Sequence, residues 1–388
     1  MNDELHGNTV TIRGVGDIMI IAGAARALEQ NGFDYPFAPV ADLIRAADIG
    51  FGNLEMPICS NPARPYFPEV CPDFYSPVQT AEALKFAGFD VLNLANNHIM
   101  DWGWDALEET LSRLYGLGMQ TIGAGINLSA ARQPAILTCN NLRVGFLGYG
   151  VRGLWNASET SPGTAPLDRN LILEDVSLLR PNVDLLVVSL HTGILSDYPN
   201  PEDRQLANDL VRNGVNLILG HGPHVIQGIE LVQGNAIYYS LGNFMIDLAS
   251  GNAENKVALQ ENVESFIADA TLRPGEKVEA RVIPLFITPQ FQAIPAEGEC
   301  ADRIQKKVIR LSQHLSKMKG LALWEHAGAL NVEHELRVLA FQGRAVSWRL
   351  VLRRLLKIRW RHVRLLIGYI VSKVRHVFAS KRSKESSV

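Results

Sequence analysis

The sequence has few cysteines, no long apolar run and almost no net charge. Its four cysteines show neither a CxxC pair nor a Cys/His finger spacing, so a structural zinc module is not expected. Cys59 and Cys71 bracket a proline-rich loop and would form a disulfide only in an oxidising compartment, so reduced thiols are the default expectation. No segment reaches the roughly 18 apolar residues needed to span a bilayer.

The first residues, MNDELHGNTVTIRGVGD, also lack the apolar stretch of a signal peptide. These absences predict a cytoplasmic chain, attached at most peripherally to the inner membrane surface.

The net charge of −3 conceals an uneven distribution of charge. Residues 344–388 hold 13 Lys and Arg residues against one acidic residue, Glu385, whereas the rest of the chain is acidic. Arginines, aromatic residues and aliphatic residues are interleaved in this tail, as in helices that lie on anionic membrane surfaces. Docking on an acidic partner and a solvated helix remain open as alternatives, and nucleic-acid binding is the least favoured.

Short apolar runs alternate with helical patterns, which predicts a layered α/β fold. The expected strands are Val10–Val15, Asp48–Phe51, Val91–Leu94, Gln120–Ile122, Leu142–Leu147, Asp184–Leu190, Asn216–Leu219, Ala236–Tyr239, and Ser265–Leu272 joined to Lys277–Phe286 by a hairpin turn at RPGEK. The expected helices are Pro77–Ala87, Trp104–Tyr115, Asn170–Leu179, Pro201–Asn213, 301–319 and a basic helix over 344–378.

Strand signals stop after about Pro295. We therefore expect an α/β domain over 1–295, a helical extension over 296–343 and a basic amphipathic tail over 344–388. The proline-rich stretch 57–77 is expected to be a long loop within the first domain.

Polar residues follow five of the apolar runs, at the point where each strand is expected to end. Parallel strands place their carboxyl ends at one edge of a sheet, where ligands gather in layered α/β folds. A single such residue would more often be a turn former or a helix cap, but five coincident cases favour a shared site. These residues are Asp17, Asn53 with Glu55, Asn96 to His98, His191, and His221 with His224.

Carboxylates, imidazoles and an amide together suit Mn²⁺, Fe²⁺ or Zn²⁺ better than Ca²⁺ or Mg²⁺, which prefer oxygen ligands. Six candidate ligands are more than one tetrahedral ion needs, but two ions that share a carboxylate would use them. Such a pair of ions assists displacement at phosphorus or carbon. The residues therefore predict a metal-assisted hydrolase, with phosphoryl or related esters as the commonest substrates.

The motifs GDIM, GNLEMPI, LANNHIMDWG, SLHTG, GHGPHVIQGIE and YYSLGNF occur in the order seen in the CapA family. The chain resembles that family over roughly residues 9–290. Its members are associated with capsule and poly-γ-glutamate synthesis and belong to the calcineurin-like metallophosphoesterase superfamily. The resemblance implies a four-layer α/β/β/α sandwich with a divalent metal site at the strand edge. It also implies an anionic polymer or phosphoester as substrate, and capsule synthase subunits as partners.

The resemblance also assigns roles to the strand-end residues. His98 is similar to the histidine that stabilises the transition state or protonates the leaving group, and Asp101 would orient it. Asn53 and Asn243 are expected near the substrate, although a bond from Asn243 to a neighbouring histidine or to its own turn is an equal alternative. The expected metal ligands are Asp17 and His224 for one ion, Glu55 as the bridge, and Asn97, His191 and His221 for the second ion.

Three positions depart from the family pattern. Met19 stands where the wider superfamily has a histidine ligand, whereas Thr192 and Leu195 stand where relatives of this family have a tryptophan and a glutamate. Asp197 is the nearby carboxylate that could replace that glutamate, but its spacing from His191 does not match the family pattern. The favoured interpretation is a hydrolase. The alternatives are a non-catalytic polymer-binding or scaffolding subunit of a membrane-associated capsule synthase, and a metal-dependent γ-glutamyl amide hydrolase.

Overall fold

The structure is a computed structural model, and it describes residues 8–60, 75–151, 153, 155–192, 196–247 and 262–317. Cys71, Leu195, most of the predicted loop 57–77 and the whole of the predicted tail 344–388 lie outside these residues. Within the described part, no helix combines the length and the apolar character that crossing a bilayer requires.

The first sheet has a parallel centre and an antiparallel outer part. Its strands are β1 (Val10–Ile18), β2 (Ile49–Leu54), β3 (Val91–Asn93), β4 (Gln120–Ile122), β13 (Asn243–Met245), β14 (Glu264–Leu272), β15 (Glu279–Ile287) and β16 (Ala293–Pro295). The order is β16-β15-β14-β1-β2-β3-β4, and β13 pairs with β1. β1 to β4 and β13 run parallel, whereas β14 to β16 are antiparallel. The predicted hairpin at RPGEK is the β14–β15 connection.

The second sheet has four parallel strands between two antiparallel edge strands. Its strands are β6 (Ala135–Cys139), β7 (Leu142–Gly150), β9 (Leu185–His191), β10 (Leu217–His221), β11 (Ile229–Val232) and β12 (Asn235–Tyr238), in the order β11-β12-β10-β9-β7-β6. Every residue of β9 is buried, as expected for a parallel strand that is covered on both faces. A separate pair joins β5 (Ala124–Gly125) to β8 (Gly163–Thr164).

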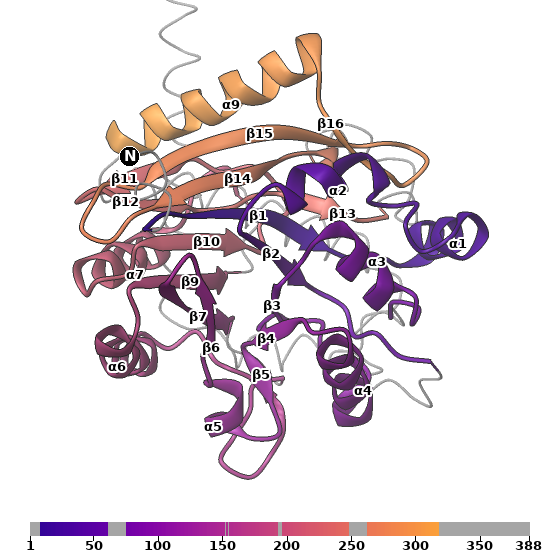
Figure 1. Cartoon of the computed structure of the whole chain (residues 1–388), viewed down its shortest axis with the longest axis horizontal. Helices are drawn as coiled ribbons and strands as arrows, with labels where there is room; N and C mark the ends of the chain where they lie inside the picture. Colours follow the sequence, from indigo (N-terminus) through magenta and orange to yellow (C-terminus); the bar gives the residue numbers. More distant parts are fainter. Residues whose placement is uncertain are drawn as a thin grey trace, which may run out of the picture.

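Helices cover the outer face of each sheet (Figure 1). The helices are α1 (Ala22–Asn31), α2 (Ala38–Arg45), α3 (Thr80–Ala87) and α4 (Gly103–Gly116) beside the first sheet, and α5 (Leu128–Ala131), α6 (Arg169–Leu179) and α7 (Pro201–Arg212) beside β5 and the second sheet. Between the sheets, the rings of Phe51 and Phe146 stack with centroids 6.0 Å apart. This confirms the predicted four-layer α/β/β/α sandwich.

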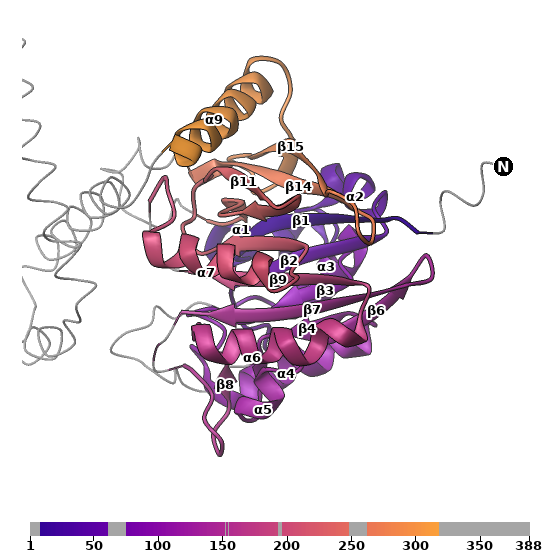
Figure 2. The same cartoon turned by 90° about the vertical axis from the view of Figure 1, so that its left-hand side faces the viewer.

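The last described helix is α9 (Gly298–Lys317), which confirms the helix predicted over 301–319. It buries Ile304, Val308, Leu311 and Leu315 against β11, β14 and β15. Figure 2 shows α9 lying across these strands at one side of the sandwich. The predicted division of the chain at residue 295 stays a prediction.

Candidate metal centre

The carboxyl ends of strands from both sheets bring the predicted residues together. In the first sheet, Asp17 on β1 is in register with Asn53 on β2 and with Asn243 on β13. In the second sheet, His191 at the end of β9 is in register with His221 at the end of β10. The sheets meet there, because Nδ1 of His221 lies 3.7 Å from Oδ1 of Asp17.

Asp17 is completely buried and is bonded on both oxygens. Oδ1 accepts a hydrogen bond from the side-chain amide of Asn53 at 2.8 Å, and Oδ2 accepts one from the backbone N–H of Gly222 at 3.2 Å. Nδ1 of His224 lies 3.1 Å from Oδ2. Burial acts to raise the pKa of Asp17, but the His224 hydrogen bond and the charges of the nearby imidazoles hold it well below its ordinary value. Asp17 is therefore an ionised ligand candidate.

Glu55 is completely buried, yet neither of its oxygens accepts a hydrogen bond from any described residue. Its Oε1 lies 3.4 Å from Nε2 of His191 and 3.7 Å from Nε2 of His224. Burial, reinforced by the negative charge of Asp17, raises the pKa of Glu55 to about 8. A buried carboxylate without donors is costly unless a cation compensates it. Atoms of Asp17, Glu55 and His224 lie within 4.8 Å of one another, a spacing at which they could share one metal ion.

The two strand-end histidines are buried and have low pKa values. Burial lowers the pKa of His191 to about 3 and that of His221 to about 4. Both rings are therefore neutral near pH 7, which is the form that binds metal. Among the described residues, neither ring nitrogen of His221 has a hydrogen-bond partner, whereas Nε2 of His191 lies 2.8 Å from Oδ1 of Asn97.

His224 completes the group from a strained backbone position. Its φ of 57° lies in the left-handed region, which non-glycine residues rarely occupy and which is commonest at functional sites. Burial opposes protonation, but the charges of Glu55 and Asp17 raise the pKa of His224 to about 10. A positive imidazole beside Asp17 and Glu55 thus holds charge that a divalent cation would supply. The donor set of carboxylates, imidazoles and an amide fits Mn²⁺, Fe²⁺ or Zn²⁺.

His98 lies at the rim of the same group, with its Nδ1 2.9 Å from Oδ2 of Asp101. Its side chain keeps 20% of its surface exposed, whereas that of Asp101 keeps 2%. Burial opposes protonation, but the hydrogen bond to Asp101 and the charge of Glu55 raise the pKa of His98 above its ordinary value. The pair has the arrangement of a proton donor held by a buried carboxylate.

Asn96 was expected only as one of the polar residues at a strand end and Asn93 was not predicted at all, yet both side chains fix this edge. The Asn96 side chain donates to the carbonyl of Leu54 at 2.7 Å and accepts from the backbone N–H groups of His98 and Ile99. The Asn93 side chain donates to Oδ1 of Asn53 at 2.8 Å. A polar residue inside the apolar run LNLA was the only sequence signal for Asn93.

Asn53 and Asn243, predicted near the substrate, are both completely buried. The amide of Asn53 lies 3.2 Å from Nδ1 of His191 besides bonding Asp17. Oδ1 of Asn243 lies 2.9 Å from Nδ1 of His224, and its amide donates to the carbonyls of His224 and Asn262. In this structure both side chains therefore contact candidate ligands rather than open space.

The departures from the family pattern also have places in the structure. Met19 is 5% exposed and packs with Ile21 and Met56 in a small apolar cluster. The backbone of Thr192 donates to the carbonyl of His221 at 2.9 Å. Leu195 lies outside the described residues.

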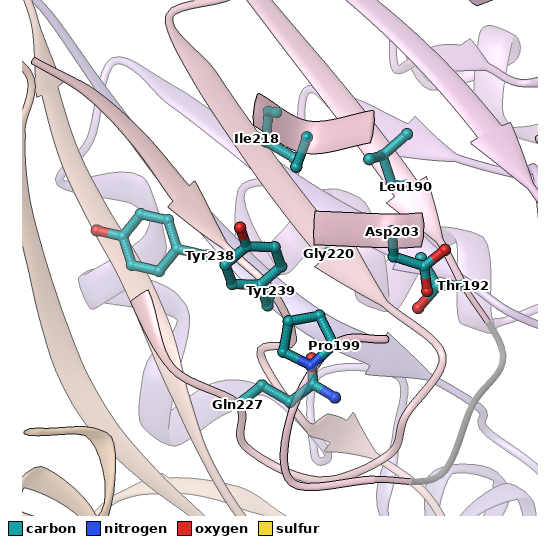
Figure 3. Close-up of a pocket in the computed structure, with 10 residues that line it drawn as sticks. Leu190, Thr192, Pro199, Asp203, Ile218, Gly220, Gln227, Tyr238 and Tyr239 are labelled. Atoms are coloured by element: carbon teal, nitrogen blue, oxygen red, sulfur yellow. The ribbon is translucent and has the colours of Figure 1, made fainter. Parts of the chain in front are cut away.

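A small cavity lies beside this edge, between α7 and the ends of β9 and β10 (Figure 3). Its lining includes Leu190, Ile218 and Tyr239 and is mostly apolar. None of the ten predicted site residues lines it. The candidate chemistry therefore belongs to the strand edge and not to this cavity.

The model of one protein family, described as bacterial capsule synthesis protein PGA_cap, matches residues 11–248. The chain is similar to the PGA biosynthesis protein CapA of Bacillus subtilis, with 34% identity over 60% of this chain and 62% of the relative. It is also similar to the capsule biosynthesis protein CapA of Bacillus anthracis, with 32% identity over 61% of this chain and 60% of the relative. The matches thus span about three fifths of the length of these relatives.

Among solved structures, the chain is distantly similar to a putative 5'-nucleotidase from Staphylococcus aureus and to a 5'-nucleotidase precursor from Thermus thermophilus. The first has 13% identity and a TM-score of 0.45, and the match covers 78% of this chain and 58% of that one. The second has 16% identity and a TM-score of 0.41, and the match covers 80% and 59%.

Proposed function

The chain belongs to the family of bacterial capsule synthesis proteins, PGA_cap, and we propose that it is a metal-dependent hydrolase of the phosphoesterase type in capsule or poly-γ-glutamate metabolism. One observation supports the metal dependence above all others. Glu55 and His221 are both completely buried, and none of their side-chain nitrogen or oxygen atoms has a hydrogen-bond partner among the described residues. Buried polar groups in native proteins are rarely left unpaired, and a cation would satisfy both.

The donor set divides into two overlapping groups. Asp17 and His224 would hold one cation, Asn97, His191 and His221 would hold the other, and Glu55 would contact both. Divalent cations bound there would supply Lewis acidity to an ester or acyl oxygen and lower the pKa of water. The neutral states of His191 and His221 keep both imidazoles available as ligands at physiological pH.

His98 would donate the proton that the leaving oxygen needs. Asp101 accepts the hydrogen bond from Nδ1, which fixes the ring and leaves Nε2 as the atom that carries the transferred proton. The raised pKa of His98 keeps this proton in place at higher pH than for a free imidazole. Asn96 would hold the loop that carries His98, because its side chain donates to the carbonyl of Leu54 at the end of β2 and accepts from the backbone N–H of His98.

The same donors would serve a γ-glutamyl amide hydrolase, because Lewis acidity activates a carbonyl as well as a phosphoryl group. A second candidate function is a non-catalytic polymer-binding or scaffolding subunit of a capsule synthase. Met19 favours this candidate, because an apolar, buried side chain stands where the wider superfamily has a ligand.

Two measurements on the purified full-length chain separate these functions. The first is the bound metal, determined by mass spectrometry after dialysis against Mn²⁺, Fe²⁺ or Zn²⁺. The second is hydrolysis of bis-p-nitrophenyl phosphate and of γ-glutamyl-p-nitroanilide with the same ions. Bound metal, with turnover that is lost when a chelator removes the metal, supports the hydrolase, and the preferred substrate assigns its class. A chain with neither bound metal nor turnover would support the scaffolding subunit instead.

A further inference from the structure

α9 has a buried apolar face and a separate basic face. Lys306, Arg310 and Lys317 are exposed, and none of them forms an ion pair with a described residue. Residues four and seven positions apart lie on the same side of a helix, so these three form one line along it. At 1.5 Å per residue, the line is about 16 Å long.

The first turns of the same helix are less positive. Arg303 is paired with Glu264 at 2.7 Å, and the acidic residues Glu299 and Asp302 lie nearby in the sequence. The uncompensated charge therefore increases toward the C-terminal half of α9.

That C-terminal half packs on the segments that follow the ligand-bearing strands. Nδ1 of His314 lies 3.1 Å from the hydroxyl of Tyr198, which follows His191 in the chain. Ser312 accepts a hydrogen bond from the backbone N–H of Ile229, in the segment that follows His224. The charge of Arg310 is close enough to Tyr198 to act on its hydroxyl. The basic line thus ends on the part of α9 that packs against the segments following His191 and His224.

We propose that the face of α9 formed by Lys306, Arg310 and Lys317 binds a linear polycarboxylate and leads it toward the strand edge. This inference rests on the proposed function, because it takes the polymer to be the substrate of the candidate metal centre. An extended chain with one carboxylate per residue carries a charge about every 3.5 Å and can contact all three side chains at once. Outside the basic tail 344–388 the chain is acidic, so a positive surface on the described part is where a polyanion would be attracted to it.

An anionic membrane is the weaker candidate for this face. Helices that lie in a bilayer surface insert apolar residues beside their basic ones. The large apolar residues of α9 face the protein core, with the exception of Ile309, which is 55% exposed.

The test uses the metal-loaded full-length chain and fluorescein-labelled poly-L-glutamate, with binding followed by fluorescence anisotropy at low ionic strength. The variant is Lys306→Gln/Arg310→Gln/Lys317→Gln. The control, Arg26→Gln/Lys85→Gln/Lys277→Gln, removes the same charges from exposed residues elsewhere. We expect the Kd to rise about tenfold in the α9 variant, as for three exposed ion pairs, and less than twofold in the control. Equal values for the two variants overturn the proposal.

A second readout locates the polymer on α9 itself. Acetylation of lysines with and without poly-L-glutamate, analysed by mass spectrometry, should show protection of Lys306 and Lys317 but not of Lys277. Absence of protection at α9 overturns the proposal even if the whole chain binds polymer. If the α9 variant loses binding to phosphatidylglycerol vesicles while its polymer binding is unchanged, the face belongs to a membrane contact and the proposal is overturned.

Failure of the proposed α9 binding surface can be told apart from failure of the proposed hydrolase function. Metal content and turnover of bis-p-nitrophenyl phosphate should be the same in the α9 variant and in the unmodified chain, because the substituted residues are not ligands. If that turnover is absent from both proteins while polymer binding depends on α9, the hydrolase proposal fails and the binding surface stands. If turnover is present and both variants bind polymer alike, the binding surface fails alone.

Discussion

Oδ1 of Asn243, on β13, lies 2.9 Å from Nδ1 of His224, in the loop that follows β10. This amide oxygen and Oδ2 of Asp17, 3.1 Å from the same nitrogen, both face Nδ1 as acceptors, so Nε2 is the ring nitrogen left for a metal ion. His224 is held there despite a left-handed backbone conformation. The pair therefore fixes both the tautomer and the position of a candidate ligand.

Replacing Asn243 should weaken metal binding without unfolding the protein. We expect Asn243→Ala to reduce metal affinity about 10- to 100-fold, as loss of groups that orient metal ligands commonly does. Asn243→Asp should retain much of the affinity, because a carboxylate also accepts the Nδ1 proton. The measurement is a competition titration of Zn²⁺ against a chromogenic chelator, with Asn31→Ala as the exposed control. Affinity unchanged in Asn243→Ala would contradict the orienting role.

The metal-free protein should lose stability as pH rises because of Glu55. Its pKa is raised from 4.5 to about 8 on folding, so between these values the folded protein binds a proton that the unfolded chain releases. The contribution of Glu55 to stability is therefore lost across this window, on the order of 1 kcal/mol per pH unit. Glu55→Gln should remove this loss and also abolish metal binding.

Urea unfolding of the chelator-treated protein at pH 6.5 and pH 8 measures this effect. The charge of Glu55 also raises the pKa of His224, so the comparison between the two proteins reports the titration of Glu55 together with its effect on His224. Glu108→Gln, at an exposed position, is the control and should behave like the unmodified chain. The same pH dependence in Glu55→Gln as in the control would show that Glu55 does not titrate in this way.

His98 should matter most for substrates with poor leaving groups. We expect His98→Ala to slow hydrolysis of a phenyl phosphodiester about 10²- to 10⁴-fold, the range that general acid catalysis covers. The p-nitrophenyl analogue should be affected far less, because its leaving oxygen needs no proton. Equal losses of kcat for the two substrates would argue for a structural role instead.

Asp101 should set the pH range in which His98 works. Because Asp101 raises the pKa of His98, Asp101→Asn lowers it, and the alkaline fall of kcat should move to lower pH. Asp105→Asn changes an exposed carboxylate in the first turn of α4 and should leave the pH dependence of kcat unchanged. A pH profile unaffected by Asp101→Asn would separate His98 from the proton transfer.

Two glycines of β1 test how tightly the strands must approach. A Cβ at Gly16 would lie 2.0 Å from the backbone carbonyl of Gly242, which leads into β13, whereas a Cβ at Gly14 meets only the side chain of Leu219 at 3.0 Å. The backbone carbonyl of Gly242 cannot move aside, whereas the side-chain methyl groups of Leu219 can. Gly16→Ala should therefore cost about 3 kcal/mol or more and Gly14→Ala about 1 kcal/mol, measured by urea unfolding. Equal costs would contradict the close β1–β13 approach.

The layered fold was predictable because buried parallel strands appear as continuous apolar runs. β9 is apolar or small up to His191 and is buried throughout, so its pattern was unambiguous. β6 was missed because its sequence, AILTC, is mostly apolar and does not show the alternation that its buried and exposed positions have in the structure. α1, with its alanine-rich start, and the three-residue strand β13 have too weak a pattern to be recognised in the sequence.

The candidate ligands were predictable individually but their contacts were not. Strand ends identify Asp17, Glu55 and His191, since each follows an apolar run. Which residues face one another depends on the register between strands and on the approach of two sheets. The chain of bonds from Asn93 through Asn53 to Asp17 crosses three strands, so no local pattern shows it.

The most direct test of the metal centre is the metal content of the purified full-length chain after loading with Mn²⁺, Fe²⁺ or Zn²⁺ and dialysis. We expect two equivalents of a divalent ion per chain, fewer in His221→Ala, and little or none in Glu55→Gln, while Glu108→Gln keeps the full amount. A chain that retains no ion, or a Glu55→Gln variant that retains as much as the unmodified protein, would contradict this expectation.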